Sequence, residues 1–533
     1  MRRFFLTVLI LCLAACASLW SEGQSEIEEE KTILKIGTPN EVKTASVFGD
    51  YYLGIFAHIS NPPLMQMNER GELTGLTAER VEVSGDNRVW TFYIRDDLYW
   101  SDGTKFSAED VKFSIEYTGE HNPNARWIGD TLEKAETGPD NSVRLTFAKP
   151  YTGLRLEFAT YNIFPKHIYE NIDDPMRHVN SGENLGFGPF YIEEIDLNAG
   201  VIEFARNRYW KGRGPKIDGF EIHIYKNVDV LSLALERGDV DTYYKYASSY
   251  PYANIERLEK TGDFDFSKKL NMGLVFLAFN VRGGVTADLS FRKAVTYAID
   301  YEEIVKLDAL GYGRIPDRGF VPPSMGGHTE TPSLDYAKAR AIRILPDAGY
   351  RDTDGDGLRE APDGGEISLS VLVRSDWNRV GELLMDYLSE IGIDSTLRSL
   401  DLNGWVAAKD EYDYDLTVTR STPWGMLMHA NWGTGYFDSR RSGRGVLHIL
   451  DDPDFLDLCD TILAVTDEEK LAQLGADVQD YYAENIPAAA LYWNEIITPY
   501  TKAYSGWAPD PLYGIYNTET FLSLSKEHAE SVP

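Results

Sequence analysis

Asp86-Asn-Arg-Val-Trp-Thr-Phe-Tyr-Ile-Arg-Asp-Asp-Leu-Tyr-Trp-Ser-Asp-Gly-Thr-Lys-Phe-Ser-Ala-Glu-Asp-Val-Lys-Phe113 is the stretch that decides the fold of this 533-residue chain. Its first half alternates Trp90, Phe92 and Ile94 with more polar neighbours. Alternation with a period of two is typical of a β-strand that buries one face. The sequence therefore predicts a strand here whose apolar side chains lie in a core.

A turn and a helix are predicted directly after this strand. Ser101-Asp-Gly103 has the composition of a tight turn. Ser107 has the features of a helix N-cap, with Asp110 three positions later as in a capping box. An apolar helix face is expected to begin with Val111, Phe113 and Ile115. The predicted unit is a strand, a turn and a capped helix.

The order of residues in this unit resembles the signature of a known family. A strand arginine, an acidic pair, an aromatic residue, Asp-Gly and then Ser107-Ala-Glu-Asp-Val-Lys-Phe113 are similar to the family 5 extracellular solute-binding proteins. These proteins are the dipeptide, oligopeptide and nickel receptors of ABC importers. Further blocks resemble the family in the same order: Leu185-Gly-Phe-Gly-Pro-Phe-Tyr-Ile192, Arg206-Asn-Arg-Tyr-Trp-Lys-Gly212, Leu231–Thr242 and Leu289–Ile304. In the first block, Phe187 stands where the family usually has a small residue.

The resemblance implies an α/β, two-lobed periplasmic-binding-protein fold (type II, Venus-flytrap) with an extra α/β subdomain in the first lobe. The predicted divisions are lobe I at 32–270 plus 495–525, an inserted subdomain within it at 51–175, and lobe II at 271–494. The chain would cross between the lobes near residues 265–280 and return near Leu491–Pro499. Two such connections let the lobes close by hinge bending, and closure is favoured only by the contacts that a ligand adds.

The N-terminus has the pattern of an export signal. Met1-Arg-Arg3 precedes an apolar run from Phe4 to Leu13, and small residues follow. Leu13-Ala-Ala-Cys16 resembles the bacterial lipobox, in which the signal is cut before a cysteine that then carries lipid. We therefore expect residues 1–16 to be a lipoprotein signal peptide with Cys16 as the lipidation site, and residues 17–31 to be a flexible tether. The expected location is the cell envelope, in the periplasm or on the outer face of the cytoplasmic membrane, with the protein held by its lipid.

Composition excludes several classes of function. The chain has 84 acidic and 52 basic residues and a net charge of -32, so nucleic acid and anionic membrane surfaces would repel it. The sequence contains no Gly-x-Ser-x-Gly, no Gly-x-x-x-x-Gly-Lys-Ser/Thr and no His-Glu-x-x-His. These absences exclude only the easily recognised classes of enzyme. The resemblance implies a receptor that is not an enzyme and requires no cofactor, with an ABC permease and its ATPase subunits as expected partners, and the protein is expected to be a monomer.

Asp352-Thr-Asp-Gly-Asp-Gly-Leu-Arg-Glu-Ala-Pro-Asp363 has the spacing of a calcium-binding loop. Asp352, Asp354 and Asp356 would offer oxygen ligands to a hard cation, with a glycine at the sharp turn. The last position is Asp363, where a bidentate glutamate is usual. Calcium bound here would be structural. The alternative is a solvated Asp-Gly turn.

A long loop after an alternating strand is the predicted place of ligand recognition. Tyr414–Thr419 alternates as a strand, and Arg420-Ser-Thr-Pro-Trp-Gly-Met-Leu-Met-His-Ala-Asn-Trp-Gly-Thr-Gly-Tyr436 leaves its end. Strand ends are where α/β folds place ligands, and aromatic residues among glycines give binding walls with backbone freedom. The predicted ligand-binding residues of this loop are Arg420, Trp424, His429, Trp432 and Tyr436. The alternative for the aromatic residues is packing beneath the loop.

The resemblance leaves two kinds of solute open. Peptide receptors of the family carry an aspartate in this loop for the peptide α-amine, and that aspartate is absent here. Trp424-Gly-Met-Leu-Met-His429 looks closer to the nickel receptors, and Asn124-Ala-Arg-Trp127 resembles a stretch in which an arginine meets the carboxylates of a metal chelate. Arg126 and Trp127 therefore join the predicted ligand-binding residues. The predicted function is peptide capture for an ABC permease, with a nickel or metal-chelate receptor as the alternative. An envelope metallohydrolase and an adhesin are less favoured.

Overall fold

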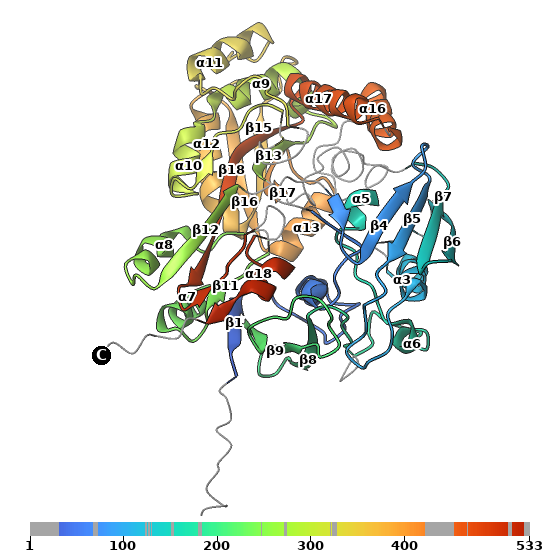
Figure 1. Ribbon diagram of the computed structural model, residues 1–533. Helices are drawn as coiled ribbons and strands as arrows, with labels where there is room; N and C mark the ends of the chain where they lie inside the picture. The colour runs from blue at the N-terminus through green and yellow to red at the C-terminus, as the bar shows by residue number, and fades with distance from the viewer. Residues whose placement is uncertain are drawn as a thin grey trace, which may run out of the picture.

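One long strand, β18 (Ala488–Thr501), runs through the middle of a 12-stranded sheet. The strand order is β16-β15-β17-β13-β18-β11-β1-β10-β9-β8, and β12 and β14 pair with β18 beside this path. The computed structural model describes residues 31–67, 73–122, 125, 128, 131–150, 154–179, 184–246, 248–270, 274–319, 321, 328–421, 452–465, 467–509 and 514–526. The strands on the two sides of β18 form the sheets of two lobes (Figure 1).

Lobe I contains the first group of strands. In its sheet β1 pairs in parallel with both β10 and β11, and β9 and β8 continue the sheet in antiparallel pairing. Leu34 and Ile36 of β1 and Phe220 of β10 are buried in its core. The strands are β1 (Ile33–Thr38), β8 (Phe190–Asp196), β9 (Val201–Arg206), β10 (Gly219–Ile224), β11 (Thr242–Tyr243), β12 (Phe264–Leu270), β19 (Tyr504–Ser505) and β20 (Ser525–Lys526). The helices are α2 (Tyr51–Phe56), η1 (Ala57–Ile59), α7 (Val228–Arg237), α8 (Tyr252–Glu259) and α18 (Thr518–Ser523).

The glycine-rich block Leu185–Ile192 leads into an edge strand, because β8 starts at Phe190 and is the last strand of the sheet. The N–H of Gly188 donates to the Ser60 carbonyl at 2.8 Å. A Cβ atom at Gly188 would lie 2.3 Å from the Ile59 carbonyl oxygen, so only glycine fits this close approach. Phe187 is fully buried, and its ring stacks on that of Phe106 at 4.2 Å between centroids.

The subdomain contains residues 86–113, the predicted strand, turn and capped helix. Its four-stranded sheet has the order β4-β5-β7-β6 and lies to one side of lobe I (Figure 1). Trp90, Phe92 and Ile94 are buried, as predicted. The strands are β2 (Met65–Met67), β3 (Leu73–Gly75), β4 (Ala78–Val83), β5 (Val89–Ile94), β6 (Leu132–Gly138) and β7 (Ser142–Phe147), and the helices are α3 (Ala108–His121), α5 (Leu154–Glu157) and α6 (Lys166–Tyr169).

Helix α3 has the predicted cap but not the predicted single apolar face. Ser107 is the N-cap, and its N–H donates to Asp110 Oδ2 at 2.9 Å. Val111 and Ile115 pack into the subdomain core, whereas Phe113 packs against the core of lobe I. The helix therefore lies between two cores, since residues two apart point to different sides of a helix.

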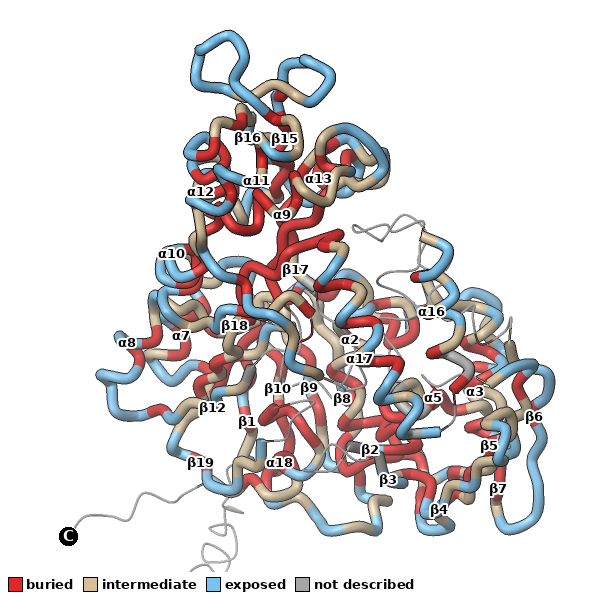
Figure 2. The backbone as a smooth tube through the Cα atoms, turned by 90° about the horizontal axis from the view of Figure 1, so that it is seen from above, coloured by how far each residue is buried: buried red, intermediate tan, exposed pale blue. Residues whose placement is uncertain are grey.

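Lobe II contains the second group of strands. In this lobe β15 pairs in parallel with β16 and β17, and β13 pairs antiparallel with β17 and β18. All six residues of β13 are buried, because its two faces contribute to separate cores. In Figure 2 the buried tube continues along β17. The strands are β13 (Leu274–Phe279), β14 (Gly313–Arg314), β15 (Ser368–Arg374), β16 (Asp394–Leu400) and β17 (Leu416–Ser421). The helices are η3 (Val285–Ala287), α9 (Leu289–Ala298), α10 (Tyr301–Leu307), α11 (Lys338–Asp347), η4 (Ser375–Trp377), α12 (Asn378–Ser389), α13 (Leu402–Asp410), α16 (Pro453–Ala464) and α17 (Glu468–Asn485).

Strand β18 belongs to both lobes. Its first part, residues 488–492, pairs with β13 of lobe II. Its second part, residues 495–501, pairs with β12 of lobe I, and Tyr500 also pairs with Thr242 of β11. The chain leaves lobe I after β12, enters lobe II at β13, and returns within β18 itself.

Candidate functional site

Strand ends from the two lobes meet at the lobe boundary. In lobe I, β11 leads into residues 244–250, and in lobe II, β15 ends at Arg374 and β17 ends at Ser421. A hydrogen bond joins the lobes here, because Arg420 Nη1 donates to Ser248 Oγ at 2.5 Å. Carboxyl ends of strands are the usual ligand sites of open α/β sheets. The lobe boundary is therefore the candidate ligand-binding site.

Hydrogen bonds from residues 244–246 and 248–250 join this part of lobe I to β18 and to the end of β1. The N–H of Tyr246 donates to Asn40 Oδ1 at 2.8 Å, just after β1. The N–H of Tyr250 donates to the Ile497 carbonyl of β18 at 2.8 Å, and the Ile497 N–H donates to Ser249 Oγ at 3.0 Å. This segment thus has a defined position relative to the strand that both lobes share.

Three tyrosines form an aromatic wall at the boundary. The ring of Tyr51 lies 5.5 Å from that of Tyr52 and 5.5 Å from that of Tyr246, both in edge-to-face contact. Asp50 caps α2 by accepting hydrogen bonds from the N–H groups of Tyr52 and Leu53, each at 3.0 Å. This cap fixes the first turn of the helix, and with it the directions of the two tyrosines. Tyr51 remains 48% exposed, so its ring can contact a ligand.

Basic side chains from both lobes gather beside these tyrosines. Desolvation lowers the pKa of Lys245 in lobe I, and Arg420 lowers it further. Desolvation also lowers the pKa of Arg420, followed by the positive charge of Arg374. Lys245 is exposed to solvent. Arg374 is paired with Asp376, its Nε donating to Oδ1 at 2.5 Å and its Nη2 to Oδ2.

The hydroxyl of Tyr51 is held in its neutral form. Desolvation raises the pKa of Tyr51 well above its ordinary value of 10.0, and Tyr246 adds to the shift through its charge and a hydrogen bond. Tyr51 can therefore offer an uncharged hydrogen-bond donor to a ligand near neutral pH.

The structure places one of the predicted ligand-binding residues at this boundary. Arg420 was expected in the loop after the strand, but it lies within β17 (Leu416–Ser421), one residue before its end, and reaches across to lobe I. The others lie outside the described residues and stay predictions, as does the lipidation site: Arg126, Trp127, Trp424, His429, Trp432, Tyr436 and Cys16.

Lys245 and the tyrosine wall were not among the residues predicted to bind the ligand. A signal was available, because Tyr244-Lys-Tyr246 directly follows Tyr243, the last residue of β11. Aromatic and basic residues at the end of a strand are the kind of group that meets a ligand. The contribution of Tyr51 and Tyr52 comes from a helix nearly 200 residues away in the chain, and local patterns do not reveal that contact.

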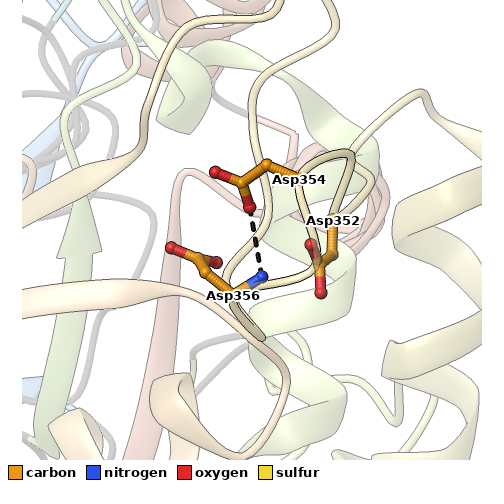
Figure 3. Close-up of side chains that lie close together, drawn as sticks. All are labelled: Asp352, Asp354 and Asp356. Carbon is orange, nitrogen blue, oxygen red and sulfur yellow. Dashed lines mark hydrogen bonds between the residues drawn. The ribbon is translucent and has the colours of Figure 1, made fainter.

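The predicted calcium loop brings three carboxylates together (Figure 3). Atoms of Asp352, Asp354 and Asp356 lie within 4.8 Å of one another, and all three residues are exposed. The loop is shaped by its own hydrogen bonds, for example from the Asp356 N–H to Asp354 Oδ1 at 3.1 Å. Asp363 is not in this group, and its Oδ1 accepts a hydrogen bond from the Gly365 N–H at 3.1 Å. Oxygen donors of this kind suit calcium, and the structural calcium ion stays a prediction.

Comparison with known proteins identifies similar sequences and folds. A family model described as "Bacterial extracellular solute-binding proteins, family 5 Middle" matches residues 72–443. The oligopeptide-binding protein OppA of Bacillus subtilis is 21% identical over 91% of this chain and 92% of its own. The nickel-binding periplasmic protein of Escherichia coli is 22% identical over 70% of each chain. The solved structure of NikZ from Campylobacter jejuni, in complex with Ni(L-His), matches with a TM-score of 0.76 and 21% identity over 93% of this chain and all of that one.

Proposed function

The chain belongs to the bacterial extracellular solute-binding proteins of family 5, and from this premise we propose that it captures peptides between its two lobes and delivers them to an ABC permease. The observation that carries the peptide assignment is the extent of the match to an oligopeptide-binding protein, which covers 91% of this chain. The match to the nickel-binding protein covers 70%. Members of this family are solute-binding proteins rather than enzymes, so the proposed function involves no catalytic step.

A metal-chelate receptor is the second candidate. It is supported by the nickel-binding relative and by the resemblance of Arg126, Trp127 and Trp424 to positions of the nickel receptors. An arginine is well suited to a chelate, because its fork of N–H donors matches a carboxylate.

Native mass spectrometry of the mature protein, purified gently from a cell extract without Cys16, separates the two candidates. A spread of bound peptide masses is the result expected from the proposal. A single adduct with a metal isotope pattern would replace it with the chelate function, and Trp424 and Arg126 would then be the first residues to substitute.

The proposed place of action is the outer side of the cytoplasmic membrane, with a lipid on Cys16 as the anchor. Among the helices that the structure describes, none is long and apolar enough to cross a bilayer. Lipid attachment predicts that Cys16→Ser moves the protein from the membrane fraction to the soluble fraction of cells. A substituted protein that stayed with the membranes would rule out this anchor.

A further inference from the structure

We infer that Tyr252 of lobe I and Tyr312 of lobe II, which we call the hinge pair, favour the lobe arrangement of this structure before any solute is bound. The inference goes beyond the proposed function, because it concerns the balance between two arrangements of the lobes rather than the solute. Only the effect of the hinge pair on solute affinity rests on the proposed function.

The rings of the hinge pair stack on each other across the lobe boundary. Their centroids lie 4.9 Å apart, and the ring planes are inclined by 23°. Tyr252 is the first residue of α8, and Tyr312 lies between α10 and β14. Figures 1 and 2 both show α8 of lobe I and α10 of lobe II to the left of β18. The hinge pair therefore joins the lobes beside the strand that they share.

Each member of the hinge pair packs against the core of the other lobe. Tyr252 packs against the lobe II core that contains Leu491, as well as against a core of its own lobe. Tyr312 packs against the lobe I core that contains Ile255 and Ile497. Turning one lobe away from the other would withdraw both rings from apolar surroundings and separate them from each other. Such a movement is opposed by the loss of buried apolar area and of the ring contact.

The hinge pair is also bound to the backbone of the shared strand. The Tyr252 hydroxyl donates to the Glu495 carbonyl at 2.5 Å, and the Glu495 N–H donates to the Tyr312 carbonyl at 3.2 Å. At Glu495 the pairing of β18 with β12 begins, three residues after its pairing with β13 ends at Tyr492. The Tyr492 hydroxyl donates to Asp308 Oδ2 at 2.6 Å, which holds the end of α10 against the same strand. The hinge pair thus lies at the part of β18 that has to bend when the lobes move.

The arrangement that the hinge pair favours is one in which the lobes meet at the candidate site. The stacked rings occur together with the hydrogen bond from Arg420 of lobe II to Ser248 of lobe I. Contacts present in only one of two arrangements shift the balance toward it. One aromatic pair corresponds to a change of about two- to tenfold in that balance. Loss of the hinge pair should therefore increase the share of open molecules.

The test measures the distance between the lobes without solute, in the mature chain that lacks Cys16. Spin labels are attached after Arg237→Cys on α7 and Arg343→Cys on α11, two exposed positions in different lobes. Cys459→Ser prevents labelling at the remaining cysteine. Double electron–electron resonance then gives the distribution of distances between the labels.

Four variants are compared in this labelled background. Tyr312→Leu and Tyr252→Leu each remove one ring of the hinge pair, so either variant can serve if the other fails to fold. Tyr312→Phe keeps the stacked ring and is the conservative rescue. Tyr336→Leu is the matched control, because Tyr336 is a tyrosine of lobe II that is 46% exposed.

Both leucine variants of the hinge pair should change the ratio of the two arrangements about two- to tenfold away from the wild-type distance. Tyr312→Phe and Tyr336→Leu should keep the wild-type distribution. A wild-type distribution in both leucine variants, even with a lower melting temperature, would show that these tyrosines only stabilise the fold and would overturn the inference.

Solute affinity separates this inference from the proposed function. The probes are a pool of three- to five-residue peptides and Ni(II)–L-histidine, titrated by isothermal calorimetry. For a probe that the wild type binds, the dissociation constant of each leucine variant should rise by the factor by which its closed fraction falls. An unchanged constant despite a smaller closed fraction would contradict the assigned direction and leave solute binding intact. If the wild type binds neither probe, the proposed function fails, whereas the distances still decide the role of the hinge pair.

Discussion

Burial raises the pKa of Glu157, the last residue of α5, from its ordinary 4.5 to about 7. A carboxyl whose pKa is raised by folding binds its proton more tightly in the folded state than in the unfolded state. Below pH 4.5 the carboxyl is protonated in both states, so the raised pKa does not change the free energy of unfolding. As the pH rises toward 7 this free energy falls, because the folded state keeps the proton that the unfolded state releases. Above pH 7 the reduction approaches about 3 kcal/mol, lessened by the solvent that still reaches this half-buried side chain.

We predict that Glu157→Gln increases the free energy of unfolding at pH 8 and changes it little at pH 5. Urea unfolding at the two pH values measures this difference. Glu120→Gln, an exposed substitution on α3, serves as the control and should have a small effect at both. Equal effects of Glu157→Gln at the two pH values would show that the carboxyl is not held protonated by burial.

Arg292 of α9 is a buried cation that serves the fold. It is 5% exposed, and its guanidinium donates to four backbone carbonyls, those of Thr286, Ala287, Asn485 and Ile486, at 2.6 to 3.0 Å. The last two carbonyls lie at the end of α17, immediately before β18. Arg292 therefore ties α9 to the start of the shared strand.

Arg292→Lys should lower the free energy of unfolding by about 2 to 4 kcal/mol, because one ammonium cannot reach all of these carbonyls. Chemical unfolding followed by tryptophan fluorescence measures the loss. Arg343→Lys, at an exposed position of α11, is the matched substitution and should leave stability unchanged. A loss no larger than that of the control would remove this role from Arg292.

Among single site residues, the sequence was informative where a side chain follows a strand. Arg420 was predicted because it ends an alternating pattern, and it does reach across the boundary. Lys245 follows a strand of two residues, which is too short to show a pattern of its own. Tyr51 meets Tyr246 only through the folding of the whole lobe. Contacts between distant segments produce no recognisable pattern in the sequence around either residue.

At the scale of elements, the turn before β8 shows how close packing determines a residue. We expect Gly188→Ala to lower the free energy of unfolding by about 1 to 3 kcal/mol, because the new methyl group would overlap the Ile59 carbonyl. Gly85→Ala is the control, since a Cβ there meets nothing within 4 Å. Thermal unfolding of both variants measures the difference. Similar melting temperatures would mean that the turn moves to accommodate the methyl group.

Elements with local signals were predicted well. The strand at Trp90 and the cap at Ser107 both follow from short patterns. The double packing of α3 did not follow, because the sequence shows which residues are apolar but not how many cores surround the helix. The pairing of β18 with both β12 and β13 is a contact between segments more than 200 residues apart. Period and composition are local properties and do not fix such pairings.

At the scale of the whole molecule, the chain connects the two lobes twice, once between β12 and β13 and once within β18. Hinge bending at these connections would bring the lobes together around a solute. We predict that saturation with a bound solute reduces the radius of gyration measured by small-angle X-ray scattering. As a control, Lys260→Gln, which changes an exposed lysine, should show the same reduction of the radius of gyration as the wild type. An unchanged radius at saturation would indicate that solute binding involves no closure.

The shared strand also affects how the protein is made. Every other strand of the 12-stranded sheet precedes β18 in the chain, so a ribosome that has reached residue 487 has synthesised all of them except this one. Until residues 488–501 emerge, β13 lacks its partner in lobe II and β12 lacks its partner in lobe I. Neither sheet can be completed during translation, because its central strand comes last. With this strand order, the 12-stranded sheet can be completed only when synthesis is almost finished, although the separate sheet of the subdomain is made early.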